Sequence, residues 1–161
     1  MVDLSLYRPN VGVVLFHPDG RVWLGRRAKT PEPWCWQFPQ GGVDRDEAER
    51  GDWEAAARRE LLEETGVRSA DLLAATEGWI TYDFPPEVSG AKIARGWKGQ
   101  KQKWFALRVT GDETEIDLTA WPPIEFEAWR WGALEEVCDL IVPFKRPAYE
   151  QVAAAFARFA A

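Results

Sequence analysis

Short apolar runs separated by turn-forming residues recur along the chain. Residues 10–16 form a valine-rich run, and after a His-Pro-Asp-Gly turn the apolar pattern resumes at residues 21–27. Two such runs about a tight turn predict a pair of strands. Residues 100–109 alternate and then run apolar, whereas residues 125–131 alternate charged with aromatic side chains. These patterns predict a central strand and a half-buried strand, respectively.

Glycine and proline mark the breaks between these segments. Residues 36–38 are predicted to form a short strand that delivers the pair Gly41 and Gly42, where the absence of a side chain allows close approach to a ligand. Residues 72–82 are interpreted as a linker that leads into a strand. Residues 83–98 contain Pro85, Pro86 and two glycines, and we expect a long loop there, which in compact domains is usually functional or mobile.

Helical spacing appears in two places. Residues 147–159 carry apolar side chains at helical intervals. A second helix is predicted to end at Gly66, which suits the left-handed position after a helix. Asp52 is a suitable N-cap for it, and the alanines at residues 55–57 favour helix.

The second predicted helix has an acidic face. Glu60, Glu63 and Glu64 stand at positions i, i+3 and i+4 and are neighbours on the helix surface. Like charges at such spacing cost about 0.2–0.5 kcal/mol per pair, so they require solvent or a cation. Oxygen ligands suit a hard cation such as Mg²⁺ or Mn²⁺. Arg58 and Arg59 could neutralise part of the face, and a solvated acidic surface is the alternative.

Composition limits the class of protein. The chain has 161 residues, of which 46% are hydrophobic, and we expect one globular domain over residues 1–161. It has no apolar run of about 18 residues and no signal-peptide pattern at its start, so we expect a cytoplasmic protein with no membrane partner. The net charge of -6 argues against a protein that coats a DNA duplex. Local clusters of Lys and Arg could still converge on a polyphosphate end.

Cysteine and histidine offer little chemistry. Cys35 and Cys138 are too few for a disulfide framework and lack the spacing of zinc ligands. His17 lies in the turn sequence and is expected on the surface. Acid–base chemistry would therefore fall to carboxylates and to metal-bound water.

Two segments together resemble the signature of the Nudix hydrolases. That signature is Gly, five residues, Glu, seven residues, then Arg-Glu-apolar-any-Glu-Glu-any-Gly-apolar, and residues 59–67 match its second half at every specified position. In the first half, Gly41 and five residues lead to Glu47, but eleven residues separate Glu47 from Arg59. The loop is thus four residues longer than the pattern, whose strict register places Gly51 at the glutamate position. Glu47 and Glu49 are the alternatives for that glutamate's supporting role.

Further strings resemble the branch of bacterial RNA pyrophosphohydrolases, which overlaps with the diadenosine tetraphosphate hydrolases. The resemblance runs from Tyr7 to about Phe156. The strings are Tyr-Arg-Pro-Asn-Val-Gly at 7–12, Trp-Gln-Phe-Pro-Gln-Gly-Gly at 36–42, Gly-Gln-Lys-Gln-Lys-Trp-Phe at 99–105, Glu-Phe at 125–126, Trp-Arg-Trp at 129–131 and Pro-Phe-Lys-Arg at 143–146. The resemblance implies the Nudix fold, an α/β/α sandwich with a mixed β-sheet.

The resemblance also implies a site with two or more Mg²⁺ ions. Glu60, Glu63 and Glu64 match the family's metal ligands, and Glu125 matches its extra carboxylate. Glu60 is favoured as the general base, Glu125 is the alternative, and Glu64 and Arg59 complete the catalytic set, with Arg59 holding a glutamate in place. The expected substrate-binding residues are Arg8, Arg27, Gln40, Gly41, Gln100, Lys101, Phe144 and Lys145. Each of them taken singly also fits a structural role: a solvated side chain for the polar residues and a core residue for Phe144.

Three functions remain open at this point. The first is conversion of 5′-triphosphate RNA to 5′-monophosphate RNA, which initiates mRNA decay. The second is hydrolysis of a dinucleoside polyphosphate by the same chemistry. The third is a catalytically silent nucleotide-binding module, against which the intact second half of the signature argues. The sequence indicates no obligate protein partner.

Overall fold

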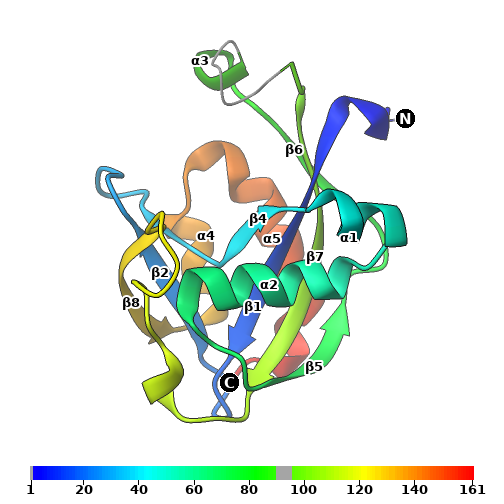
Figure 1. Cartoon of the computed structure of the whole chain (residues 1–161). Coiled ribbons are helices and arrows are strands. Elements are labelled where there is room, and N and C mark those ends of the chain that lie inside the picture. The colour runs from blue at the N-terminus through cyan, green and yellow to red at the C-terminus, as the bar shows by residue number, and fades with distance from the viewer. Residues whose placement is uncertain (1, 90–95) are drawn as a thin grey trace.

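A computed structural model describes residues 2–89 and 96–161 of the chain (Figure 1). Residues 90–95, which belong to the predicted loop at 83–98, lie outside the described residues. The described part of that loop includes a short helix, α3 (Pro86–Ser89). None of the helices in the described ranges combines the length and the apolar character needed to cross a lipid bilayer.

The strands form one mixed sheet. Its members are β1 (Tyr7–Phe16), β2 (Val22–Arg27), β3 (Trp36–Gln37), β4 (Gln40–Gly42), β5 (Ala70–Ala75), β6 (Ile80–Asp83), β7 (Gly99–Val109) and β8 (Phe126–Gly132). The main order is β3-β2-β1-β7-β5, while β4 pairs with β1, β6 with β7 and β8 with β2. β1 and β7 run parallel, and the other pairs are antiparallel.

Helices cover both faces of this sheet. The α-helices other than α3 are α1 (Arg45–Arg50), α2 (Trp53–Thr65), α4 (Val137–Leu140) and α5 (Arg146–Phe156). Short 3₁₀ helices occur at Leu4–Leu6, Glu113–Glu115, Leu134–Glu136, Pro143–Lys145 and Ala157–Phe159. In Figure 1, α2 crosses in front of β1 and β7, and α4 and α5 lie behind them. The predicted α/β/α sandwich with a mixed sheet is therefore confirmed.

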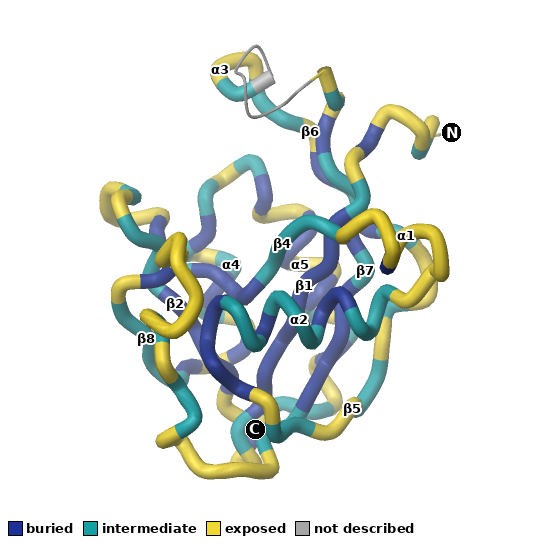
Figure 2. The backbone as a smooth tube through the Cα atoms, in the orientation of Figure 1, coloured by how far each residue is buried: buried dark blue, intermediate teal, exposed yellow. Residues whose placement is uncertain are grey.

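The apolar side chains of β1 alternate between the two faces of the sheet, and this explains the two layers of the core. Val11, Val13 and Leu15 pack in one cluster with apolar residues of α2, whereas Val14 and Phe16 pack in a second cluster with residues of α5. Successive side chains of a strand point to opposite faces, so an unbroken apolar run fills both layers. Figure 2 shows these central strands as buried and the surrounding loops as exposed.

The ends of α2 follow the expectations from the sequence. The Asp52 carboxylate accepts a hydrogen bond from the Ala55 amide at 3.1 Å, as an N-cap does. Gly66 has a φ of 83°, and its amide donates to the Leu62 carbonyl at 2.8 Å. A β-carbon on Gly66 would also stand 2.6 Å from the Glu115 carbonyl oxygen. Both caps fix where the acidic face of α2 begins and ends.

β1 and β2 diverge and leave a wedge-shaped space between them, which a segment of the site fills. These two strands pair at Phe16 and Val22 near their turn, and farther along β1 pairs with β4 while β2 pairs with β3. The connector formed by residues 36–42 therefore fills the space between two diverging strands. It presents Gln37 from the β2 side and the two glycines from the β1 side.

The linker expected from residue 72 onward is wrong at residues 72–75, whereas the strand expected to follow the linker is confirmed at residues 80–83. Residues 70–75 form β5, which pairs with β7, and residues 80–83 form β6. β5 lies at the edge of the sheet, and Leu72 is 41% exposed there. An edge strand with few buried side chains has little alternation to reveal it, so pairing with β7 decides the structure here.

Candidate active site

Four glutamates converge on one cleft. Three come from α2 and the fourth stands directly before β8, and together they border a cleft of about 360 Å³ that we call the acidic cleft. Its lining residues are Glu60, Glu63, Glu64, Trp121, Pro122, Pro123 and Glu125. The Ala28 amide donates to the Glu125 carbonyl at 2.9 Å and ties this segment to the end of β2. The fold thus brings together all four glutamates that the sequence nominated as ligands.

Glu64 is the most deeply placed of the four. Its side chain is buried, and one carboxylate oxygen accepts a hydrogen bond from the Gln40 amide at 3.2 Å. Burial, followed by the nearby charges of Glu60 and Glu125, holds the pKa of Glu64 well above its ordinary value. A buried carboxylate with like-charged neighbours is costly unless a cation compensates it.

Glu60 lies against the glycine pair. Burial raises its pKa, and the neighbouring Arg59 guanidinium opposes that rise. A β-carbon at Gly41 would collide with the Glu60 carboxyl group. Gly41 is therefore required for β4 to approach α2 this closely.

Arg59 connects two glutamates of the acidic cleft to neighbouring elements. Its Nη1 donates to Glu60 at 2.9 Å and to Glu63 at 3.1 Å. Its Nε and Nη2 each donate to one oxygen of Glu47 at 2.9 Å, and Nη2 also donates to the Gly42 carbonyl at 2.9 Å. One planar guanidinium thereby links α1, α2 and β4. Its hydrogen bonds hold the pKa of the Glu47 carboxyl below the ordinary range.

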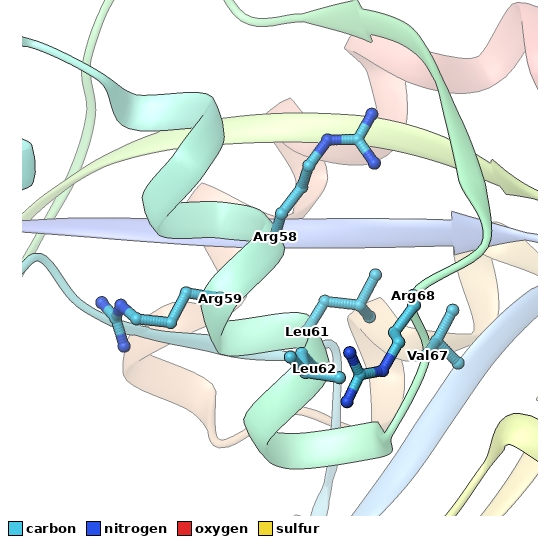
Figure 3. A pocket seen from close by; sticks show the side chains of 6 residues that line it. All are labelled: Arg58, Arg59, Leu61, Leu62, Val67 and Arg68. Atoms are coloured by element: carbon cyan, nitrogen blue, oxygen red, sulfur yellow. The ribbon is translucent and has the colours of Figure 1, made fainter.

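Arg58 does not share this role. Figure 3 shows Arg58 and Arg59 pointing to different sides of α2, beside a cavity of about 290 Å³ that Leu61, Leu62 and Val67 also line. Arg58 donates to Glu54 at 3.0 Å and to the Ala70 carbonyl at 2.9 Å. Neutralisation of the acidic face therefore falls to Arg59.

A second cavity adjoins the acidic cleft across Glu125. It encloses about 460 Å³, and we call it the basic cavity because three cationic side chains line it. Its lining residues are Arg8, Asn10, Arg27, Thr30, Trp34, Gln37, Gln40, Gly41, Gly42, Tyr82, Phe84, Val88, Gln100, Glu125, Val142, Phe144 and Lys145. Seven of the eight predicted substrate-binding residues are among them.

Phe144 and Lys145 enter the basic cavity from the segment before α5. Phe144 is half-buried and packs edge-to-face with Tyr82, with ring centroids 5.8 Å apart. Lys145 is buried, with its Nζ 5.6 Å from the centre of the Tyr82 ring. Burial and the charge of Arg27 lower the pKa of Lys145 to about 7. Phe144 therefore presents an aromatic surface to the cavity while it also packs against the core.

Lys101 lies elsewhere. Its Nζ stands 5.0 Å from the centre of the Trp79 ring, and it is absent from the lining of the basic cavity. The strand period explains the difference, because Gln100 faces the cavity and the next residue of β7 points to the opposite face. The expectation that Lys101 belongs with the other substrate-binding residues is not met by this geometry.

Comparison with known proteins identifies the family. The NUDIX domain model matches residues 6–152. The chain belongs to the Nudix family. An RNA pyrophosphohydrolase of Caulobacter vibrioides is 66% identical over 160 residues, which cover 99% of this chain and 91% of that protein. An RNA pyrophosphohydrolase of Rhodospirillum rubrum is 49% identical over 154 residues, or 96% of this chain and 89% of that protein.

Solved structures support the same fold. The crystal structure of a C. elegans Ap4A hydrolase binary complex has a TM-score of 0.64 at 20% identity and covers 94% of this chain and 98% of that one. The E. coli dihydroneopterin triphosphate pyrophosphohydrolase has a TM-score of 0.64 at 20% identity, with coverage of 92% and 98%. At this identity the likeness concerns the Nudix fold alone.

The structure shows how the longer Nudix signature is accommodated. The longer stretch between Glu47 and Arg59 contains the end of α1 and its C-cap Gly51, which has a φ of 65°, before the N-cap Asp52 of α2. Of the two alternatives, Glu47 is buried against Arg59, whereas Glu49 is exposed and pairs with Arg45 at 3.1 Å. Of these two glutamates, Glu47 is therefore the one that contacts Arg59.

Members of the Nudix family generally use divalent metal ions. The donor set of the acidic cleft fits this chemistry, since it consists of carboxylate oxygens that hard divalent cations prefer. In the ranges that the structure describes, no group of three or more acidic, cysteine or histidine side chains is already arranged to hold an ion. Arg59 engages one oxygen each of Glu60 and Glu63, which leaves the second oxygen of each carboxylate without a contact to Arg59.

Several lining residues carry no signal in the sequence that would mark them as part of a site. Trp34 and Trp121 are exposed beside the two cavities, and Asn10, Gln37 and Tyr82 line the basic cavity. Their segments are far apart in the sequence, and each residue type is common in cores and loops. Gln37 belongs to the string at residues 36–42 that resembles the family. That it lines the cavity follows only from the position of this segment between β1 and β2.

Proposed function

We propose that this Nudix protein is an RNA pyrophosphohydrolase, which hydrolyses the 5′-triphosphate of RNA to a 5′-monophosphate and pyrophosphate. The observation that carries the proposal is that the acidic cleft and the basic cavity share Glu125. Phosphates above the carboxylates would then lie next to a cavity with cationic and aromatic walls. The names of the relatives at 66% and 49% identity support this substrate. We further infer that residues 1–161 form one Nudix domain that acts in the cytoplasm, where transcripts are made.

Glu60, Glu63, Glu64 and Glu125 are the proposed ligands of two or more Mg²⁺ ions, with Mn²⁺ as the alternative. Bound divalent ions would stabilise the charge of the displaced phosphates and lower the pKa of water. The raised pKa of the buried Glu64 supports this role, because a carboxylate in that position gains most from a cation.

Arg59 is proposed as a positioning residue. Its contacts to Glu60 and Glu63 are backed by the ion pair with buried Glu47, so the guanidinium stays in place when either ligand turns. Glu60 is the proposed general base, because its carboxylate is partly buried and is adjacent to the other ligands; Glu125 is the alternative. Proton removal needs a carboxylate within hydrogen-bond reach of water.

The basic cavity would bind the phosphates and the first bases. Arg8 and Arg27 offer planar forks that match phosphate oxygens, and Lys145 offers a point charge in the basic cavity. Phe144 would stack on a base, a contact worth about 1–3 kcal/mol. Gln40, Gly41 and Gln100 complete the proposed contacts of this cavity. Lys101 is left out because of its position over Trp79.

A dinucleoside polyphosphate is the second candidate substrate. It also presents a base next to a polyphosphate, so the same cationic and aromatic residues would serve it. The fold of the C. elegans Ap4A hydrolase shows that a relative of this architecture acts on such a molecule. A silent binding module is disfavoured, because all four glutamates converge on one cleft.

The deciding experiment compares kcat/KM for a short 5′-triphosphate RNA and for diadenosine tetraphosphate, each with Mg²⁺ and with Mn²⁺. We expect pyrophosphate release from the RNA at the higher kcat/KM and no turnover in EDTA. Preference for the dinucleotide would favour the second candidate. Binding of either compound without product, in any divalent ion, would establish the silent module instead.

A further inference from the structure

Trp34 is the most exposed of the ten tryptophans, at 48%. Its indole has no hydrogen bond to any described residue and no ring contact with one, and it belongs to neither apolar cluster of the core. It nevertheless borders the basic cavity, together with Arg8, Arg27 and Phe144. Single exposed apolar side chains are common on protein surfaces. An open aromatic face beside cationic side chains in a cavity, however, is suited to a nucleotide base.

The loop that carries Trp34 is fixed at both ends. It connects β2 to β3, and the Arg27 amide closes it by donating to the Cys35 carbonyl at 2.7 Å. At its start, the Ala28 amide donates to the carbonyl of Glu125, the residue that both cavities share. The backbone of Trp34 therefore has a defined place beside the site, while its ring remains open to a ligand.

Phe144 and Trp34 reach the basic cavity from different elements. Phe144 precedes α5 and is half-buried in ring contact with Tyr82, so only part of its ring faces the cavity. Trp34 comes from the loop after β2. Bases of single-stranded RNA that is held by a protein stack on aromatic side chains, one base after the next. The cavity thus offers separate aromatic surfaces for two bases, and its arginines match the phosphate that would join them.

We propose that Trp34 is a second stacking platform of the basic cavity, which holds the base adjacent in the RNA chain to the base on Phe144. The inference rests on the proposed function, since its occupant is the 5′ end of an RNA. One phosphate joins neighbouring nucleotides in RNA, so both bases can enter one cavity. In a dinucleoside polyphosphate the whole polyphosphate separates the two bases, and phosphates held at the acidic cleft would leave the second base beyond that cleft. Trp34 therefore contributes to the binding of RNA and not of the dinucleotide.

The test pairs the ring of Trp34 with single bases of the substrate. The substrates are 5′-triphosphate trinucleotides with three normal bases or with one abasic residue at the first, second or third position. For the wild type, KM should rise about 10-fold or more when the base that stacks on Trp34 is missing. Trp34→Leu should raise KM for the intact RNA by a similar factor with kcat nearly unchanged, and loss of that one base should then have no further effect. Trp34→Phe keeps an aromatic ring and should recover most of the affinity.

A comparison with Phe144→Leu makes the test specific for a second platform. The base whose loss no longer matters in Trp34→Leu should adjoin the base identified in the same way with Phe144→Leu. Identification of the same base by both variants would overturn the inference. So would a KM for the intact RNA that Trp34→Leu leaves unchanged, or a rise in KM for diadenosine tetraphosphate as large as that for RNA.

Controls separate stacking from folding and from the proposed function. Trp34→Leu should melt within about 2 °C of the wild type, because the ring is exposed and lies outside the core clusters. Leu72→Ala removes another exposed apolar side chain, at the edge of the sheet, and should keep the wild-type pattern. Should the wild type hydrolyse no RNA, the proposed function fails. Kd values of the same RNAs for Glu64→Gln with and without Trp34→Leu then decide the inference: a loss confined to one base supports it, and equal Kd values overturn it.

Discussion

The acidic cleft and the basic cavity meet at Glu125, yet they are built in opposite ways. Three of the four glutamates of the cleft come from two turns of α2, and one guanidinium, that of Arg59, holds two of them. The cavity draws its lining from β1, β2, the wedge connector, β6, β7 and the segment before α5. Chemistry that depends on charge is therefore local in the sequence, whereas recognition depends on how distant segments come together.

The two regions also differ in what each leaves unsatisfied. The cleft concentrates like charges, and burial raises the pKa values of Glu60 and Glu64. The cavity contains three cationic side chains. Divalent cations would complete the cleft, and the phosphates of a substrate would complete the cationic cavity. Mutations can test that division, starting with the largest effect.

The largest effect is expected from Glu64→Gln. Loss of the buried carboxylate should reduce kcat by about 10³-fold or more, since several kcal/mol of charge stabilisation by the metal depend on it. Without divalent ions the variant should be at least as heat-stable as the wild type, because it removes a buried charge whose pKa is raised. Measurements of kcat with Mg²⁺ and of the melting temperature in EDTA test these two expectations. Glu54→Gln, on the same helix but outside the cleft, is the matched control, and near-normal turnover by Glu64→Gln at saturating Mg²⁺ would refute the assignment.

A smaller loss with a different signature is expected from Glu47→Gln. The folded-state pKa of Glu47 lies below its ordinary value of 4.5 because Arg59 stabilises the charged form. Its contribution to stability is therefore complete above pH 4.5 and disappears as the pH falls through the lowered pKa. Breaking the charged pair should cost about 2–3 kcal/mol at neutral pH, and kcat should fall about tenfold as Arg59 loosens.

Urea unfolding of wild type and Glu47→Gln between pH 7 and pH 3 measures this linkage. The two stability curves should converge at the acid end. Glu49→Gln, which alters the exposed neighbour paired with Arg45, should track the wild type at every pH. Curves that stay parallel down to pH 3 would show that the Arg59–Glu47 pair does not carry the stability.

In the basic cavity, Phe144→Leu is expected to act on binding. The substitution keeps an apolar side chain against Tyr82 but removes the aromatic face. KM for 5′-triphosphate RNA should rise about 10-fold, within the range of a lost base-stacking contact, with kcat nearly unchanged. Phe159→Leu, in the 3₁₀ helix that follows α5 and in ring contact with Phe156, is a suitable control. A fall in kcat without a change in KM would place Phe144 in positioning of the phosphates instead.

The same contrast explains what the sequence could predict. The acidic helix, both of its caps and the apolar strands followed from spacing and residue type, because those signals are local. Glu47 could not be separated from Glu49 in the sequence, since the choice depends on how α1 folds back onto Arg59. β5 was missed because its edge position gives it little alternation. That Gln37 lines the basic cavity depends on the position of residues 36–42 between β1 and β2, which no local pattern describes.

The smallest effect is expected from a substitution on the face of β7 that lies opposite the basic cavity. Gln100 and Lys101 are adjacent in the sequence, but Lys101 lies over Trp79 on the face opposite the basic cavity. Lys101→Met should therefore change kcat/KM less than about twofold, the scale of an exposed charge. Lys145→Met should raise KM for RNA at least tenfold, because it removes a buried amine with a pKa of about 7 that phosphates beside it would keep protonated. Measuring both variants on a dinucleotide and on a longer RNA sharpens the comparison. A loss in Lys101→Met confined to the longer RNA would mean that the chain beyond the first bases runs across the Trp79 face, so that recognition extends outside the basic cavity.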